Sequence, residues 1–273
     1  MIRPPTSSWS LDIAGIWRYR DLVALFVKRD LVTAYKQTLL GPLWHVIQPL
    51  MMTLIFTFVF GSIAKLSTDG VPHLLFYLSG VVLWRYMSDC LGRTADTFGA
   101  NAGLFGKVYF PRLTVPIAVV VSSLGTLAVQ MALFLTMLAI YWLRGAPVTP
   151  GPLVLLFPLL IVQMAALGLG LGLTISSMTA RYRDLTHIIP LAVQLWMFAT
   201  PIVYPASKIP ERWQWLRVVN PMTPVVELFR LAFLGVGSVT ALGVVIGLSI
   251  TAAILIAGLV LFSRVEKQFV DSI

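Results

Sequence analysis

Residues 180–230 read ARYRDLTHIIPLAVQLWMFATPIVYPASKIPERWQWLRVVNPMTPVVELFR, and they constrain the architecture more than any other part of the chain. A basic patch leads into a short apolar span, then a Pro-broken, Trp-rich segment, then an apolar run that contains Glu227 and Arg230. That last run is too short to cross a bilayer, which needs about 20 apolar residues. Charged, discontinuous backbone between two membrane spans is typical of segments that line a cavity rather than face lipid. The stretch therefore indicates a transport path rather than a simple anchor.

The composition of the chain is that of a polytopic membrane protein. Of its 273 residues, 58% are hydrophobic and 11% are charged, whereas a soluble domain carries about 25% charged residues. The mean hydropathy is +0.87. The first residues show no cleavable signal pattern, so we expect insertion through the first internal span. Cys90 is the only cysteine, which excludes an intrachain disulfide and a Cys-based metal site.

Hydropathy predicts six membrane spans in one transmembrane domain covering 1–273, with no internal repeat and no linker to a second domain. The spans are 39–63, 71–91, 115–143, 152–178, 188–204 and 236–262. With the N-terminus inside, thirteen Lys and Arg residues lie on the inner side and six on the outer side. That bias predicts both termini in the cytoplasm, and it attributes the net charge of +9 to topology rather than to nucleic-acid binding.

A basic amphipathic helix is predicted over 11–36, before the first span. Its apolar face comprises Ile16, Tyr19, Val23, Phe26 and Val27, and its basic face comprises Arg18, Arg29 and Lys36. Such a helix beside a membrane usually lies in the interface with lipid. Interfacial anchoring is therefore the favoured interpretation, and docking of a partner is the alternative.

Arg85 and Asp89 stand four residues apart inside the second predicted span. At that spacing they share one helix face and can pair, which lowers the cost of placing either charge near lipid. They fall toward the cytoplasmic end of the span. The pattern favours a structural pair at the inner interface, and the functional alternative is a polar wall of the transport path.

Glu227 and Arg230 lie one helical turn apart in the run VVELFRLAFLG. Thr223 is suited to cap this short helix, Pro224 to its first position and Gly235 to its end. The preceding segment IPERWQWLRVVN reads as another short helix. The two together predict a re-entrant hairpin on the outer side, and the alternative is an ordinary interfacial loop with its tryptophans at headgroup depth.

The predicted cytoplasmic loop 93–112 reads RTADTFGANAGLFGKVYFPR and is short, Gly-rich and aromatic. A solvated loop has no need of aromatic side chains, so they favour a docking surface for a cytoplasmic protein. Gly106 and Lys107 superficially resemble a phosphate-binding loop. However, Asn101 stands where the first glycine is needed, and Val108 replaces the Ser or Thr that would hold Mg²⁺. We therefore expect ATP to be used by a partner rather than by this chain.

The sequence predicts neither a catalytic site nor a metal site. His45, His73 and His187 lie at three different span edges, and no HExxH, GxSxG or clustered carboxylates occur. Aromatic residues are abundant in the spans, and helix packing or an interfacial belt explains most of them. Aromatic faces also stack on sugar rings, as a sugar-conducting channel would require. The candidates for that role are Phe56, Phe60, Tyr77, Trp84, Trp196 and Tyr204.

Five blocks of residues occur in order along nearly the whole chain. They are Arg29-Asp30 with Tyr35-Lys36-Gln37-Thr38, Leu40-Gly41, Trp44 and Gln48-Pro49; Asn101 with Lys107-Val108-Tyr109-Phe110-Pro111-Arg112; Tyr182-Arg183-Asp184-Leu185 with Gln194-Leu195-Trp196 and Pro201-Ile202-Val203-Tyr204-Pro205; Pro210-Glu211-Arg212-Trp213 with Asn220-Pro221-Met222-Thr223 and Glu227-Leu228-Phe229-Arg230; and Arg264-Val265-Glu266-Lys267. In this order they resemble the permease subunit of type-2 ABC exporters that move O-antigen, capsule or teichoic-acid polysaccharides.

The resemblance implies an all-α polytopic membrane protein that forms a homodimer and joins two copies of a separate cytoplasmic ABC ATPase. ATP and Mg²⁺ would be bound by that ATPase, and no cofactor by this chain. Residues 11–36 would lie on the cytoplasmic interface, 93–112 would hold the coupling helix, and 205–235 would form outer gate helices. A lipid-linked polysaccharide would cross the bacterial cytoplasmic (inner) membrane through a channel at the dimer centre, among membrane lipids and without any nucleic acid.

The resemblance also assigns residues to roles, none of them catalytic. The ATPase-coupling residues would be Arg29, Asp30, Tyr35, Lys36, Asn101, Lys107, Tyr109, Phe110, Arg112, Arg183 and Asp184. The outer-gate residues would be Pro205, Glu211, Arg212, Trp213, Asn220, Glu227 and Arg230.

Three other functions compete with this interpretation. A type-2 ABC permease for a small drug or lipid shares the fold and the ATPase, but the five blocks argue for polysaccharide. A polytopic membrane enzyme would need a convergent acid/base or nucleophile set. A secondary transporter usually places carboxylates or helix breaks at mid-membrane, whereas the breaks predicted in this chain lie on the outer side.

Overall fold

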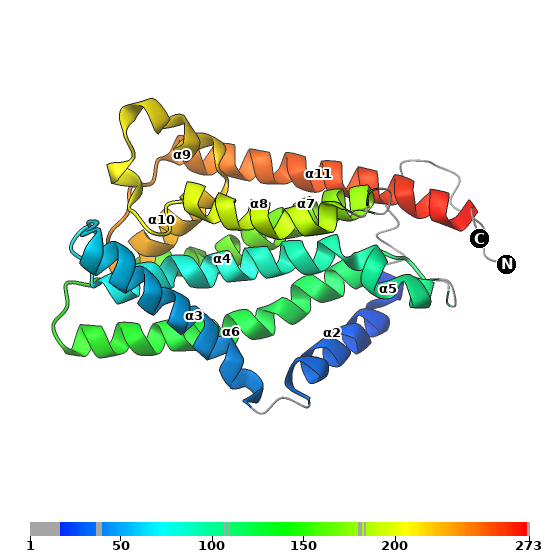
Figure 1. Ribbon diagram of the computed structural model, residues 1–273, viewed down its shortest axis with the longest axis horizontal. Helices are drawn as coiled ribbons and strands as arrows, with labels where there is room; N and C mark the ends of the chain where they lie inside the picture. The colour runs from blue at the N-terminus through cyan, green and yellow to red at the C-terminus, as the bar shows by residue number, and fades with distance from the viewer. Residues whose placement is uncertain are drawn as a thin grey trace.

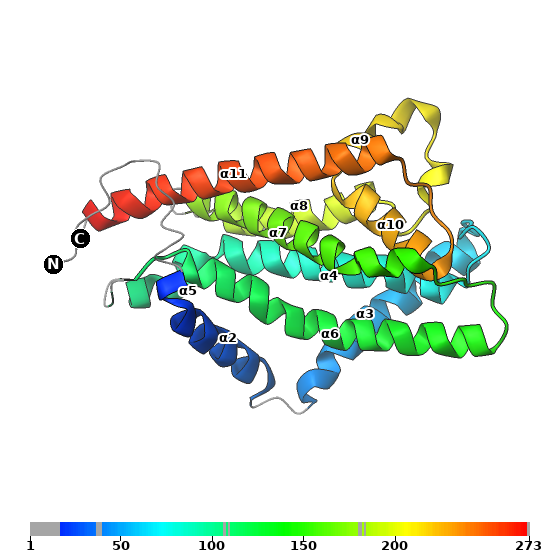
Figure 2. The ribbon, with the colours of Figure 1, turned by 180° about the vertical axis from the view of Figure 1, so that it is seen from behind.

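The computed structural model of the protein is an elongated helical bundle, with no strand among the residues it describes (Figure 1). It describes residues 17–36, 40–105, 108, 110–179, 182 and 184–271. The long helices run along the bundle, and short elements close its two ends. One end holds α5 and the last turns of α11, and the opposite end holds α9 and α10 (Figures 1 and 2). We call these the α5 end and the α10 end.

Helices make up most of the described chain. In chain order the elements are α2 (Arg20–Tyr35), η1 (Gly41–Leu43), α3 (Trp44–Phe56), η2 (Thr57–Ile63), α4 (His73–Ala95), α5 (Thr97–Phe105), α6 (Thr114–Leu143), η3 (Pro152–Leu156), α7 (Phe157–Thr179), α8 (Leu185–Ala199), η4 (Ala206–Lys208), η5 (Glu211–Trp213), α9 (Trp215–Val219), α10 (Met222–Leu234) and α11 (Ala241–Asp271).

Helix α4 is the centre of the bundle. It contacts α3, α6, α7, α8 and α10, and most of its side chains are buried. The main hydrophobic cluster gathers around it and includes Leu75, Phe76 and Met87. Because α4 is surrounded by protein, its charged side chains can find protein partners rather than face lipid. This position accounts for a core helix that carries both Arg85 and Asp89.

Three glycines in the run LGLGLGL of α7 permit close approach of its two neighbours. A Cβ added to Gly168 would lie 2.7 Å from the Cβ of Cys90 in α4, and one on Gly172 would also meet α4. A Cβ on Gly170 would lie 2.7 Å from the Cα of Leu255 in α11. Small residues at helix contacts let membrane helices pack backbone to backbone. Helix α7 is thereby held between α4 and α11.

Four helices are long and apolar enough to cross a membrane. They are Gly41–Ile63, Thr114–Leu143, Pro152–Thr179 and Ala241–Glu266. They correspond to the first, third, fourth and sixth predicted spans. The second and fifth predictions also fall on helices, but α4 is too polar and α8 too short to meet the same criterion.

The fifth and sixth predicted spans have different boundaries in the structure. Helix α8 stops before Thr200, which is extended because the residue before a proline disfavours the helical conformation. Helix α11 begins at Ala241 rather than at residue 236. Gly235 and Gly237 hold φ angles of 76° and 153°, which no helix contains. Hydropathy alone extends both spans into these breaks.

Helix α2 lies obliquely against α6 (Figures 1 and 2). The first part of the predicted helix 11–36 lies outside the described residues. Phe26 is buried, and Val23 and Val27 are partly buried, in a small cluster that also contains Phe110. The predicted apolar face of this helix thus packs at least partly on the protein. Its location in the membrane interface stays a prediction.

We expect Gly170→Ala to lower the midpoint of thermal unfolding, because its Cβ would meet the backbone of Leu255, which cannot move aside. Overpacking of this kind costs about 1–3 kcal/mol. Gly92→Ala in α4 is the matched control, since a Cβ there would meet no atom within 4 Å and alanine favours the helix. Thermal unfolding in detergent would measure both variants, and equal midpoints would contradict the close crossing.

Candidate functional sites at the two ends of the bundle

Arg230 is the centre of the α10 end. Its side chain is 1% exposed and donates from Nη1 to the carbonyl of Pro201 at 2.6 Å and from Nη2 to that of Ile202 at 2.8 Å. Its Nε donates to the Ser79 hydroxyl in α4 at 3.2 Å. The guanidinium also lies over the Phe76 ring, 3.6 Å from the centroid. One buried cation therefore joins α4, α10 and the turn that follows α8.

Glu227 completes this network on the same helix. Its Oε1 lies 3.4 Å from Nη1 of Arg230 and accepts from the backbone N–H of Ala206. Its Oε2 accepts from the backbone N–H of Ser238 at 2.9 Å. Burial lowers the pKa of Arg230 to about 10, and the Glu227 carboxylate opposes that shift. Arg230 therefore stays protonated at neutral pH.

Asn220 joins the end of α8 to the start of α10. Its Nδ2 donates to the Thr200 hydroxyl at 2.9 Å, and its Oδ1 accepts from the indole of Trp196 at 3.3 Å. The same Oδ1 accepts from the backbone N–H of Met222 at 3.1 Å. Asn220 thus satisfies an N–H of the first turn of α10, which has no partner inside the helix.

The caps predicted for this helix are partly wrong. The helix begins at Met222, and Thr223 makes no capping hydrogen bond because Asn220 already serves the first turn. Pro224 therefore stands inside the first turn rather than at its first position. The predicted end at Gly235 is confirmed: this residue adopts the left-handed conformation with φ of 76°. A Cβ there would also collide with Thr149.

The predicted outer-gate residues fall into two groups at this end. Pro205, Asn220, Glu227 and Arg230 are buried. Glu211, Arg212 and Trp213 are exposed on the segment between α8 and α10. This segment forms two short pieces, η5 and α9, rather than one half-helix. The structure thus contains one buried helix, α10, preceded by a broken and exposed segment.

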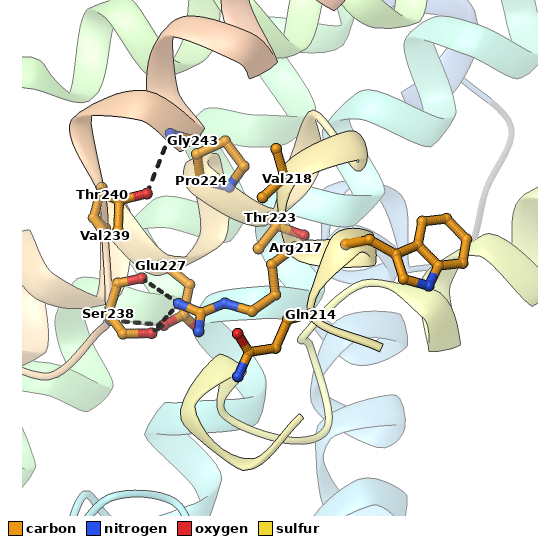
Figure 3. Close-up of a pocket in the computed structure, with 11 residues that line it drawn as sticks. Gln214, Arg217, Val218, Thr223, Pro224, Glu227, Ser238, Val239, Thr240 and Gly243 are labelled. Atoms are coloured by element: carbon orange, nitrogen blue, oxygen red, sulfur yellow. Dashed lines mark hydrogen bonds between the residues drawn. The ribbon is translucent and has the colours of Figure 1, made fainter. Parts of the chain in front are cut away.

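A pocket opens between α9, α10 and the start of α11 (Figure 3). Its volume is about 320 Å³, and its lining includes Gln214, Arg217, Thr223 and Glu227. Arg217 reaches across from α9 and donates from Nη2 to the Ser238 hydroxyl at 2.8 Å and to its carbonyl at 3.0 Å. Because Ser238 is also bound by Glu227, the pocket adjoins the buried ion pair.

Arg93 plays a similar joining role at the α5 end. Its Nη2 donates to Oδ2 of Asp30 in α2 at 2.6 Å. Its Nη1 donates to the hydroxyls of Ser122 and Ser123 in α6 at 3.1 and 3.2 Å. Arg29 also reaches Asp30, at 2.9 Å. Both arginines are nearly half exposed, so each ion pair contributes under about 1 kcal/mol, and their main effect is to position α2.

The segment after α5 is tied to the end of α11. The backbone N–H of Arg112 donates to Oε1 of Glu266 at 3.0 Å, and its Nη1 donates to the Glu266 carbonyl at 3.2 Å. Phe98 stacks on Phe262 with ring centroids 5.0 Å apart. Helix α5 itself is kinked at Asn101, whose side chain bonds back to a carbonyl four residues earlier. Such local bonds compete with helical hydrogen bonding.

The predicted coupling residues are only partly brought together. Arg29 and Asp30 meet in α2, Phe110 packs on Phe26 with centroids 5.8 Å apart, and Arg112 is buried against α11. The remaining described ones, Lys36, Asn101 and Asp184, belong to three different segments of the chain. Lys107, Tyr109, Arg183 and the Tyr35 side chain lie outside what the structure describes. The coupling role of all these residues stays a prediction.

The predicted pair of Arg85 with Asp89 does not form as an ion pair among the described side chains. Arg85 instead donates from Nη2 to Oε1 of Gln48 in α3, at 2.8 Å. This exposed contact joins α3 to α4. Of the two interpretations left open for Arg85, the structural one fits this contact.

The aromatic candidates lie in and around the core. Phe56, Tyr77 and Trp84 are buried in the main hydrophobic cluster. Phe60, Trp196 and Tyr204 are partly buried at its edge, and Trp84 meets Trp196 edge to face with centroids 5.2 Å apart. The three partly buried residues, Phe60, Trp196 and Tyr204, each retain exposed surface that a neighbouring molecule could contact. Stacking on sugar rings stays a prediction for all six.

Several residues in these networks were missed by the sequence reasoning. Ser79 accepts a hydrogen bond from Arg230, and Ser238 donates one to Glu227. Gln48 accepts a hydrogen bond from Arg85. They are short polar residues in or beside apolar helices, with no motif to mark them. Arg93 stood at the edge of the predicted coupling loop but was not assigned a role. Among the described residues, no group of three His, Cys, Asp or Glu side chains could hold a metal ion.

The fold is that of a polytopic helical membrane protein whose ends are tied by polar side chains. Residues 21–234 match the sequence profile of the ABC-2 type transporter family, and the chain therefore belongs to that family. The resemblance to type-2 ABC permeases is thereby confirmed.

Its curated relatives are polysaccharide exporters. The chain is 26% identical to an O-antigen export system permease of Klebsiella pneumoniae, over 92% of this chain and 94% of the relative. It is 27% identical to an O-antigen export system permease of Myxococcus xanthus, over 81% and 83% of the two chains. It is 28% identical to a polysialic acid transport protein of Escherichia coli, over 76% and 78%.

Arg230→Met would leave Glu227 buried without its cation. Breaking a buried ion pair from one side costs about 3–5 kcal/mol, so we expect a large fall in the midpoint of thermal unfolding. Arg212→Met is the control: this arginine is exposed, and its guanidinium lies over the ring of the neighbouring Trp213. The double variant Arg230→Met/Glu227→Gln should recover part of the loss. Equal midpoints for the two single variants would show that the Arg230 network contributes little.

Proposed function

We propose that this chain is the channel-forming permease subunit of an ABC transporter that exports lipid-linked polysaccharide of the O-antigen type. Membership of the ABC-2 type transporter family carries the transport part of the proposal. The polysaccharide part is carried by O-antigen export permeases that align over 94% and 83% of their length. The chain itself would catalyse no reaction.

Six spans and two cytoplasmic termini are the proposed topology. Helix α4 would be the second span, since its polar side chains contact protein inside the bundle. Helix α8 would be the fifth, although its 15 residues extend only about 22 Å. The Lys and Arg bias then places the α5 end in the cytoplasm and the α10 end outside. This arrangement supports insertion in the bacterial cytoplasmic (inner) membrane.

A homodimer is the proposed assembly. Helix α8 has one buried side chain, Met197, and much of α3 is exposed. The two helices meet at their ends, where Phe56 and Phe198 lie 6.4 Å apart. Two neighbouring helices with exposed apolar surface can pack against a second copy, and the glycan would pass between the copies, along the aromatic candidates.

A separate ATPase would drive transport from the α5 end. ATP and Mg²⁺ would be held by that partner, in two copies per dimer. The kinked α5 and the segment up to Arg112 are tied to α11 through Glu266, while Asp30 ties α2 to Arg93. A push on this end would therefore reach α4 and α11 directly. The α10 end, with its broken segment η5 and α9, is the proposed outer gate.

The docking of the ATPase can be tested at Val108, which is 53% exposed at the α5 end. We expect Val108→Asp to abolish co-purification of ATP hydrolysis with the tagged chain, because a charge replaces an apolar contact. Val219→Asp is the control: Val219 is also 53% exposed but lies in α9 at the opposite end. Loss of activity in both variants, or in neither, would argue against docking at the α5 end.

The substrate can be tested in a strain that lacks this chain. We expect surface polysaccharide to disappear and lipid-linked polysaccharide to accumulate inside the cell, with wild-type chain restoring export and Val108→Asp failing to do so. Immunoblotting of intact cells and extraction of lipid-linked glycan would measure both pools. Normal surface polysaccharide with altered sensitivity to small drugs would instead favour the small-molecule permease.

A further inference from the structure

The pocket at the α10 end is lined by a polar side chain that has no hydrogen-bond partner among the described residues. Thr223 is 5% exposed and lines the pocket, yet its hydroxyl makes no hydrogen bond among the described residues. The hydroxyl oxygen is not among the fully buried unpaired atoms of the described residues, so it can be reached from the pocket. Since Thr223 does not cap α10, its hydroxyl is free for something that enters the pocket.

Most of the other free groups around Thr223 are hydrogen-bond donors. Arg217 uses Nη2 on Ser238, and its Nε and Nη1 have no partner among the described residues. The Gln214 side-chain amide is also unpaired there. In contrast, the carboxylate of Glu227 already accepts from Ala206, Arg230 and Ser238. The free polar groups therefore carry one positive charge and call for acceptor oxygens.

Apolar residues make up much of the remaining pocket lining. They are Trp215, Val218, Pro224, Val239 and Gly243, and Figure 3 shows Val218 on the side of Thr223 and Val239 on the side of Ser238. A bare inorganic anion would use the donors and leave this surface wet. A neutral sugar ring would use the apolar surface and leave Arg217 without a counter-charge. A pyranose ring that bears a carboxylate satisfies both, and about 320 Å³ lies at the small end of ligand pockets.

We propose that this pocket binds an acidic sugar unit of the exported polysaccharide as it emerges at the α10 end. The carboxylate would meet the free edge of Arg217, a ring oxygen or hydroxyl would accept from Thr223, and the C–H face would lie on Val218 and Val239. This inference rests on the proposed export function for its ligand. It explains a free arginine edge and a free hydroxyl in the pocket that the ion pair itself does not need.

Saturation-transfer NMR on the permease–ATPase complex in lipid nanodiscs would test the pocket. The probes are glucuronate (ring and charge), glucose (ring alone) and inorganic phosphate (charge alone). We expect glucuronate to bind, with weaker signals from glucose and no competition from equimolar phosphate. Thr223→Val, which keeps the side-chain shape, and Arg217→Gln should each weaken glucuronate binding about tenfold, as expected for the loss of a hydrogen bond to a charged ligand.

Arg212→Gln is the control, since Arg212 lies on the same exposed segment but outside the pocket lining. It should bind glucuronate as the wild type does. Unchanged binding by Thr223→Val with a wild-type unfolding midpoint would overturn the proposal, as would equal binding of glucose or full displacement by phosphate. The NMR experiment measures glucuronate binding independently of polysaccharide export. If the wild-type chain restores polysaccharide export in the deletion strain but binds no glucuronate, only the pocket proposal is refuted. If the deletion strain shows no defect in polysaccharide export, only the proposed function is refuted.

Discussion

The burial of Arg230 is the constraint on which the α10 end depends. A guanidinium removed from water must be surrounded by acceptors, and here the acceptors come from three different elements. Ser79 and the Phe76 carbonyl come from α4, two carbonyls come from the turn after α8, and Glu227 comes from α10 itself. Glu227 then uses its other oxygen on Ser238, just before α11. One charge thus sets the relative positions of four elements.

The central position of α4 is a second constraint, because this helix carries charged side chains that need protein partners. A helix that faced lipid could not carry Arg85, Asp89 and Arg93 without a large penalty. Surrounded by α3, α6 and α7, the same helix donates hydrogen bonds to Gln48 and to two serines of α6. The glycines of α7 complete the arrangement, because without a Cβ they bring that helix against α4 on one side and α11 on the other.

Sequence reasoning located most of the helices but little of their contact chemistry. Long apolar runs and the left-handed Gly235 were readable, since hydropathy and glycine conformation are local properties. The ends of α8 and α11 were misjudged because apolar residues continue past the backbone breaks. The partner of Arg85 was misassigned because i, i+4 spacing reports only neighbours on one helix, whereas Gln48 lies 37 residues away in the chain. Contacts of Arg230 and Arg93 with serines have no sequence signal at all.

The two arginine junctions differ in the way that a transporter driven from one end would require. Arg93 belongs to α4, and Arg230 contacts α4 through Ser79. The two junctions are separated by about 21 Å of continuous helix, from Ser79 to Arg93. Arg93 is 43% exposed, so its contacts with Asp30 can exchange with water at little cost. Arg230 is buried, and separating it from Glu227 would expose an uncompensated charge. Force applied at the α5 end would therefore rearrange the Arg93 junction first, while α4, α10 and the start of α11 move together as one body.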